Sequence, residues 1–125
     1  MEPTLDVKQF VFVIKCWYAF TLPKKGDVVL LQVDDRGLLK RIVGLPGEKI
    51  EIKDKDVYIN DAKLDEPFVV HRDPQLDEKR DTLPALTIPE DSYFVMGDNR
   101  DESKDSRAFG PVKREQLQGK VILFF

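Results

Sequence analysis

Short apolar runs that are rich in β-branched and aromatic residues recur along the chain and are typical of β-strands, and the run from Lys49 to Lys53 alternates strictly with a period of two. Pro- and Gly-containing turns separate the runs, and Leu45-Pro46-Gly47-Glu48 fits a type II turn. The pattern predicts eight strands, which run from Phe10 to Lys15, Asp27 to Gln32, Leu38 to Gly44, Lys49 to Lys53, Val57 to Ile59, Leu86 to Ile88, Ser92 to Met96 and Val121 to Phe125. We expect one helical turn, from Arg114 to Gln118. Short strands, frequent turns and little helix predict an all-β domain, either sheet-on-sheet or barrel-like.

The periodic pattern is interrupted at two kinds of place. Asp34-Asp35-Arg36-Gly37 and Asn60-Asp61 are typical of tight turns between strands. Residues 71–85 show no period, and Pro74 and Pro84 bracket charges of both signs. We interpret this segment as an exposed, variable loop within one domain that covers residues 1–125.

Composition narrows the possible classes of protein. The chain is 42% hydrophobic and 34% charged with a net charge of −3, which is typical of a globular domain and gives no indication of a nucleic-acid partner. Cys16 and His71 are the single cysteine and histidine, so an internal disulfide and a Cys/His zinc site are excluded. No run reaches the roughly 18 apolar residues of a membrane span, so any anchor would lie outside this sequence.

The apolar segment from Phe10 to Phe20 has two interpretations. It contains β-branched and aromatic residues on both faces, including Trp17 and Tyr18. Such a segment is either a core strand or an exposed strip that meets a membrane or an extended substrate.

The stretch Gly97–Arg107 is the most polar part of the chain. It contains charges of both signs, two serines and no large apolar side chain. It is either a solvated loop or a network whose groups satisfy one another and position a catalytic group. Its aspartates suggest a calcium loop, but cations stand where calcium needs oxygen ligands, so we expect no metal.

Lys40 is the candidate for chemistry elsewhere in the chain. It shares its strand face with Leu38 and Ile42, whereas Arg41 points to the opposite face. A lysine on an apolar face either extends to the edge of the sheet or is desolvated, and desolvation makes it a usable general base. A hydroxyl would complete a Ser-Lys dyad. Ser103 could be either the nucleophile or a positioning group, as could Ser106, and spacing does not decide which.

Several motifs together resemble the type I signal peptidases. These are Met1-Glu2-Pro3-Thr4-Leu5, the segment from Lys40 to Gly47, and the complete stretch Gly97–Arg107, supported by Val57-Tyr58-Ile59-Asn60 and Phe109-Gly110-Pro111-Val112. The resemblance implies the fold of signal peptidases and SOS repressors, with short antiparallel strands, long loops and little helix. It also implies a serine endopeptidase that cleaves signal peptides from exported preproteins after small residues (Ala-x-Ala). No cofactor is implied.

The resemblance also assigns roles to residues. Lys40 would be the general base, and Ser103 would orient it. Asp105 would pair with Arg41 on the far face of the strand, while three further residues would brace the site: Asp98, Arg100 and Arg107. The pockets for small substrate side chains would be lined by Met1, Leu5 and Leu39. The segment from Phe10 to Phe20 would face the outer side of the cytoplasmic membrane.

The family's nucleophile would be a serine just before the position of Met1. The 125-residue sequence holds neither this serine nor the oxyanion-hole donors next to it, so we expect it to be inactive as written. Two explanations are open, a truncated peptidase and a catalytically dead domain that binds signal peptides or scaffolds a secretion complex. Two less favoured alternatives are a self-cleaving protease of the SOS-repressor type and an enzyme that uses Ser103 as its nucleophile.

Overall fold

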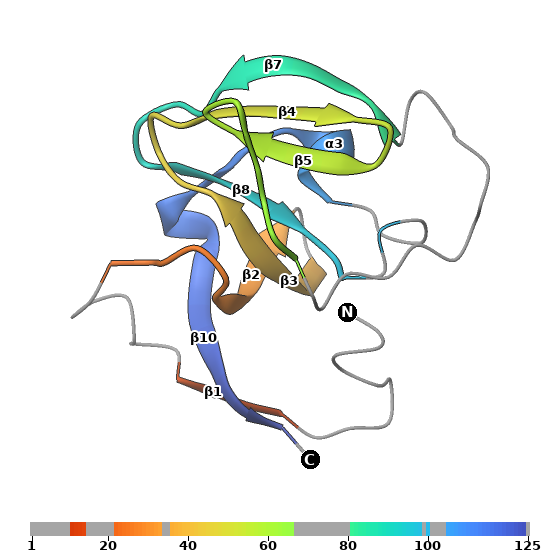
Figure 1. Ribbon diagram of the computed structural model, residues 1–125. Coiled ribbons are helices and arrows are strands. Elements are labelled where there is room, and N and C mark those ends of the chain that lie inside the picture. Colours follow the sequence, from red (N-terminus) through yellow and green to blue (C-terminus); the bar gives the residue numbers. More distant parts are fainter. Residues whose placement is uncertain are drawn as a thin grey trace.

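The computed structural model describes residues 11–14, 22–33, 36–66, 81–98, 100 and 105–124, and their strands form two antiparallel sheets (Figure 1). The six-stranded sheet has the order β1 (Val11–Ile14), β10 (Leu117–Phe124), β2 (Val28–Val33), β3 (Arg36–Gly44), β8 (Ser92–Met96) and β9 (Val112–Lys113). The four-stranded sheet has the order β6 (Ala62–Lys63), β5 (Asp56–Ile59), β4 (Lys49–Lys53) and β7 (Leu83–Thr87). The helical elements with both ends in the described residues are short, α3 (Ser106–Phe109) and the 3-10 turn η2 (Arg114–Gln116). The all-β prediction is therefore confirmed.

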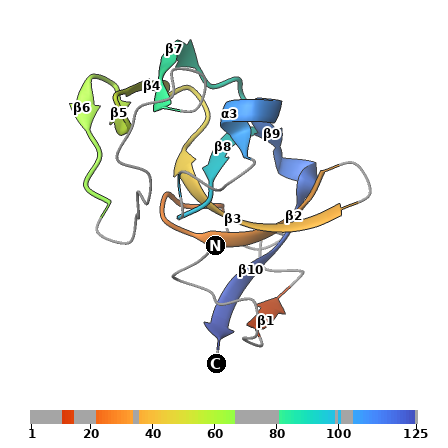
Figure 2. The same ribbon diagram turned by 90° about the vertical axis from the view of Figure 1, so that its right-hand side faces the viewer.

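Strands β3 and β8 separate two hydrophobic cores, because alternate residues of a strand face opposite sides of the sheet. The first core lies on the face of Ile42 and Val95 and consists of Val29, Leu31, Ile42, Tyr93, Val95, Val112 and Leu117. The second lies between β3, β8 and the four-stranded sheet, and consists of Val43, Ile50, Ile52, Val57, Ile59, Ile88, Phe94 and Met96. Figure 2 shows the four-stranded sheet as a separate layer above β3. Consecutive residues of β3 therefore enter different environments.

Tight turns shape one hairpin of the second sheet and the connection that enters it from β3. Asn60 and Asp61 both adopt left-handed backbone conformations, with φ of 50° and 70°, as the predicted turn requires. Gly47 has a φ of 80°, and the amide of Glu48 donates to the carbonyl of Leu45 at 3.1 Å, which confirms the type II turn.

Several boundaries differ from the prediction. Strand β7 begins at Leu83, so the patternless segment ends earlier than residue 85. Leu83 pairs with Ile52 of β4, and Pro84 is tolerated because β7 is an edge strand. Arg36 and Gly37 belong to β3, whose register pairs Arg36 with Val33. The two-residue strands β6 and β9 were not predicted, because so short a segment carries no measurable period.

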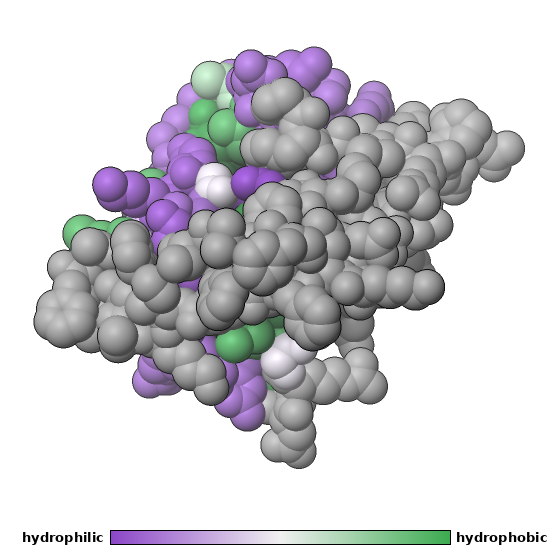
Figure 3. Space-filling view, turned by 90° about the horizontal axis from the view of Figure 1, so that it is seen from below, coloured by the Kyte–Doolittle hydropathy of each residue, from purple (hydrophilic) through white to green (hydrophobic). Residues whose placement is uncertain are grey.

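Strand β1 and the last residues of β10 form a ribbon at one end of the molecule (Figures 1 and 2). The rest of the segment from Phe10 to Phe20 lies outside the described residues, so its contact with a membrane stays a prediction. In the view from below, the coloured surface is mainly hydrophilic with small apolar patches (Figure 3). Within the described part of the chain, no helix is long and apolar enough to cross a membrane.

Candidate active site

Lys40 lies in the middle of β3, opposite Val29 of β2, on the face that covers the first core. The residue is only 8% exposed, so it does not reach freely into water. Burial lowers the pKa of Lys40 below its ordinary value of 10.5, because it disfavours the charged ammonium. The carboxylate of Asp105 raises this pKa and the guanidinium of Arg107 lowers it, both less strongly than burial. The lysine therefore loses its proton more readily than an exposed one.

Asp105 and Ser106 close the free edge of β8. Strand β9 pairs with β8 only at Ser92 and Tyr93, so the amides farther along β8 need other acceptors. The amide of Val95 donates to Oγ of Ser106 at 2.9 Å, and the amide of Gly97 donates to Oδ2 of Asp105 at 3.1 Å. The two side chains thus take the place of a neighbouring strand and fix the start of α3 against β8.

Asp105 is also the N-cap of α3 and the partner of Arg107. Its Oδ1 accepts from the backbone amide of Arg107 at 3.1 Å and from Nε at 2.9 Å, and Oδ2 accepts from Nη2 at 3.0 Å. Asp105 is fully buried, so these charge-assisted bonds compensate the loss of water around its carboxylate.

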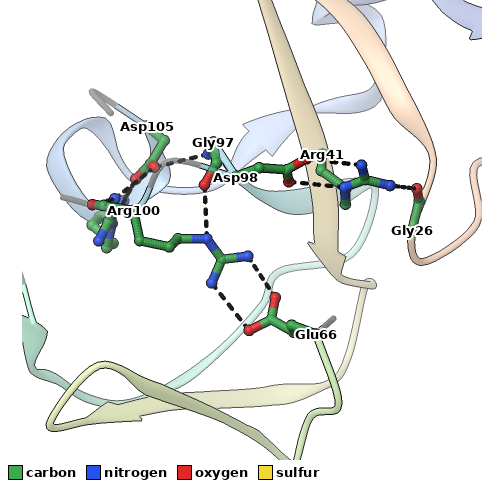
Figure 4. Close-up of polar contacts among 8 residues, drawn as sticks. Gly26, Arg41, Glu66, Gly97, Asp98, Arg100 and Asp105 are labelled. Carbon is green, nitrogen blue, oxygen red and sulfur yellow. Dashed lines mark hydrogen bonds and ion pairs between the residues drawn. The ribbon is translucent and has the colours of Figure 1, made fainter. Parts of the chain in front are cut away.

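The expected pairing of Arg41 with Asp105 is wrong. The Nε and Nη2 atoms of Arg41 both donate to the carboxylate of Asp98 at 2.9 Å, and Nη1 donates to the carbonyl of Gly26 at 2.9 Å (Figure 4). The register explains the difference. Arg41 lies opposite Met96, and Asp98 follows two residues later on the same face. Asp105 instead acts on Lys40, on the other face of β3.

Arg100 connects the polar stretch to the second sheet. Its Nε donates to the carbonyl of Gly97 at 2.7 Å, and its Nη1 and Nη2 donate to the two carboxylate oxygens of Glu66 at 3.1 and 2.5 Å (Figure 4). Arg100 is 1% exposed and the side chain of Glu66 is 9% exposed. Glu66 follows β6, so this ion pair joins two regions that are 34 positions apart in the sequence.

The structure leaves part of the predicted site untested. Met1, Leu5 and Ser103 lie outside the described residues, and Leu39 is half-buried in β3 beside Lys40. Sequence reasoning missed Glu66, because one acidic residue in a loop gives no signal of its own. Among the described residues, no group of three acidic, histidine or cysteine side chains could hold a metal ion.

Comparison with known proteins places the chain among the peptidases. The family model described as "Signal peptidase, peptidase S26" matches residues 1–125, and the chain belongs to this family. It is 38% identical to signal peptidase I S of Bacillus subtilis (strain 168), over 100% of the chain and 71% of that protein. It is 37% identical to signal peptidase IB of Staphylococcus aureus (strain Mu50 / ATCC 700699), over 100% and 72%.

A solved structure has the same fold. The crystal structure of a signal peptidase I from Enterococcus faecalis V583 matches with a TM-score of 0.67 and 32% sequence identity, over 82% of this chain and 98% of that one.

Proposed function

We propose that the chain is the catalytic domain of a signal peptidase I that cleaves signal peptides from exported preproteins after small residues, with Lys40 as general base. The observation that carries this proposal is the burial of Lys40 beside Asp105 and Arg107, in a chain that matches the peptidase family along its whole length. A base near neutral pH needs a lowered lysine pKa, and burial supplies it.

The proposed reaction has two halves. The neutral amine of Lys40 takes the proton of a serine hydroxyl, and the serine oxygen attacks the carbonyl carbon of the scissile peptide bond. The resulting ammonium then gives its proton to the leaving amine as the C–N bond breaks, which leaves an acyl-enzyme ester. Lys40 next takes a proton from water, and the water oxygen attacks the carbonyl carbon of the ester. The ester C–O bond then breaks, and the Lys40 ammonium gives its proton to the serine oxygen, which regenerates both groups.

The serine in this reaction is the one that the family resemblance puts immediately before Met1. Ser103 would hydrogen-bond to Lys40 and orient it, and Met1, Leu5 and Leu39 would line the substrate pockets. A scaffolding domain would gain nothing from a buried lysine, whose desolvation costs stability. The position of Lys40 therefore favours the enzyme over the non-catalytic alternative.

We propose that the protein acts at the cytoplasmic membrane, with this domain on the outer side. The segment from Phe10 to Phe20 would provide the apolar contact with the membrane, because Trp17 and Tyr18 each combine an apolar ring with a polar atom.

The test is cleavage of an Ala-x-Ala peptide by a chain whose upstream residues are restored up to a serine immediately before Met1, so that the nucleophile and the oxyanion-hole donors are both present. We expect the extended chain to cleave after the second alanine and the 125-residue chain to be inactive. Replacing the added serine by alanine, or Lys40→Ala, should lower kcat on the order of 10⁴-fold. Lys53→Ala is the matched control, because the side chain of Lys53 is 63% exposed on β4. An inactive extended chain, or full activity in Lys40→Ala, would refute the proposal.

A further inference from the structure

Glu66 holds a buried arginine of the polar stretch from outside that stretch. The guanidinium of Arg100 donates from all three nitrogens, once to the carbonyl of Gly97 and twice to Glu66. The two bonds to Glu66 are parallel and bidentate, which fixes the orientation of the guanidinium plane as well as its position. Since Arg100 is 1% exposed and remains charged at all accessible pH values, it needs an anionic partner.

Arg100 is connected by hydrogen bonds to the charged groups near Lys40. The carbonyl of Arg100 accepts from Nη2 of Arg107 at 2.7 Å, and Arg107 is paired in turn with Asp105. Gly97 is held at both ends, since its amide donates to Asp105 and its carbonyl accepts from Arg100. The described residues of the stretch thus form a closed set of contacts that includes both charged neighbours of Lys40.

We propose that Glu66 is a positioning residue for the lysine of the active site. By pairing with Arg100, it fastens the described part of the polar stretch to the second sheet, and this keeps Asp105 and Arg107 in place beside Lys40. The inference rests on the proposed function only in its assignment of Lys40 as the base. Glu66 itself contacts Arg100 and takes no part in the chemical steps.

The measurement that tests this role is the pKa of Lys40 in the folded 125-residue chain, followed by NMR of 13C-labelled lysine side chains. It needs no peptidase activity, so its failure is distinguishable from failure of the proposed function. Glu66→Gln removes the charge that holds Arg100, and the contacts around Asp105 and Arg107 should loosen. Water then reaches Lys40 more easily. Because burial affects the pKa of Lys40 more strongly than Asp105 or Arg107 does, we expect this pKa to rise toward 10.5.

The direction of the change separates positioning from a simple charge effect. Loss of a carboxylate, acting through space alone, would lower the pKa of a lysine. A rise therefore requires that the surroundings of Lys40 have changed. An unchanged or lowered pKa in folded Glu66→Gln would overturn the proposal.

Two further single variants serve as controls. Val57→Ala removes buried apolar volume from the same sheet without a change of charge, and it should leave the pKa of Lys40 as it is. If the pKa of Lys40 rises as much in Val57→Ala as in Glu66→Gln, the effect reflects a general loss of stability, which contradicts the inference. Glu66→Asp keeps the charge with a shorter reach, so it should fold more readily and raise the pKa less than Glu66→Gln does. A rise in Glu66→Asp as large as that in Glu66→Gln would contradict it.

A double variant tests whether Glu66 acts through Arg100. Arg100→Met should raise the pKa of Lys40, and Glu66→Gln combined with Arg100→Met should raise it no further, because the contact is already lost. If the two rises in pKa add, Glu66 affects Lys40 by a route that does not pass through Arg100, and the inference is overturned.

The same change can be followed by kinetics in the serine-extended chain. If the pKa of Lys40 in Glu66→Gln is one unit higher, kcat/KM at low pH should fall about tenfold, with KM unchanged.

Discussion

Lys40 and Arg41 are consecutive residues of β3 with different electrostatic surroundings. Lys40 faces the first core and is destabilised as an ammonium by burial, whereas Arg41 faces the second sheet and is paired with Asp98. A guanidinium stays charged, so its site supplies a carboxylate and a carbonyl, while an amine can respond to burial by losing its proton. Only the lysine can therefore serve as a base.

The lowered pKa of Lys40 predicts how stability depends on pH. Between the folded pKa of Lys40 and 10.5, the unfolded chain binds more protons than the folded chain, so this residue makes stability rise with pH across that window. Lys40→Met removes the cost of burying the charge at neutral pH. We expect Lys40→Met to be more stable than the wild type at pH 7, with a difference that shrinks as the pH approaches 10.5. Urea unfolding at several pH values measures it, and a pH-independent difference would contradict the prediction.

The Arg41–Asp98 pair should be important for stability. Asp98 is fully buried, so Asp98→Asn leaves the cation of Arg41 without its counter-charge at a site 13% exposed. Breaking a buried pair in this way costs about 3 kcal/mol of unfolding free energy. Asp61→Asn is the control, because the Lys49–Asp61 pair lies on the surface and its loss should not be measurable by urea unfolding. Equal effects of the two substitutions would contradict the assignment.

Sequence reasoning at this scale left the burial of Lys40 open and failed for the partner of Arg41. The apolar neighbours of Lys40 in β3 allowed either a lysine that extends to the edge of the sheet or a desolvated one, and the structure shows it buried. The partner of Arg41 depends on the register of β3 against β8, which are about 50 positions apart, and no local pattern contains that register. The pairing of Glu66 with Arg100 has the same origin.

At the scale of elements, the bulge in β3 directs the chain from one sheet to the other. The register against β8 shifts between Ile42 and Gly44, where β3 leaves the first sheet toward the turn that begins β4. A side chain at Gly44 would bring its Cβ to 2.4 Å from Cδ1 of Ile88 and 3.2 Å from Cβ of Phe94. Glycine is therefore required here by the closeness of the second core.

Gly44→Ala should destabilise the domain by about 1–3 kcal/mol, because the buried neighbours must move to accommodate the methyl group. Gly37→Ala is the matched control on the same strand. Its Cβ would meet Cδ1 of Leu30 at 3.6 Å, an ordinary contact, so the change should stay within about 0.5 kcal/mol. Thermal or urea unfolding of both variants gives the comparison, and a larger loss in Gly37→Ala would contradict this account.

Several strands were predictable from their own residues. β4 alternates because one face is buried, and β8 is a short apolar run because both of its faces are buried. Both have the predicted bounds, whereas β2 is shifted by one residue at each end and β3 begins two residues earlier. β7 was predicted to begin later, since four of its five residues are exposed and Pro84 suggested a loop. Its pairing with β4, rather than its own sequence, makes it a strand.

For the whole molecule, the polar stretch links the face of β3 that carries Lys40 to the second sheet on the other face. Lys40 belongs to the first sheet, Glu66 follows β6 at an edge of the second, and Asp105 and Arg107 join them through Arg100. From the sequence, a desolvated lysine and a self-satisfied polar stretch were each one of two alternatives, and the family resemblance favoured them. The sequence did not predict that the second sheet contributes a partner, because this depends on how the layers stack.

The most direct test of the central claim is the pH dependence of peptide cleavage by the serine-extended chain. If buried Lys40 is the base, kcat/KM rises with pH along one ascending limb whose midpoint lies below 10.5, the ordinary lysine value. Lys40→Ala should abolish this activity across the whole pH range. A limb centred at or above 10.5, or cleavage that persists in Lys40→Ala, would contradict the account.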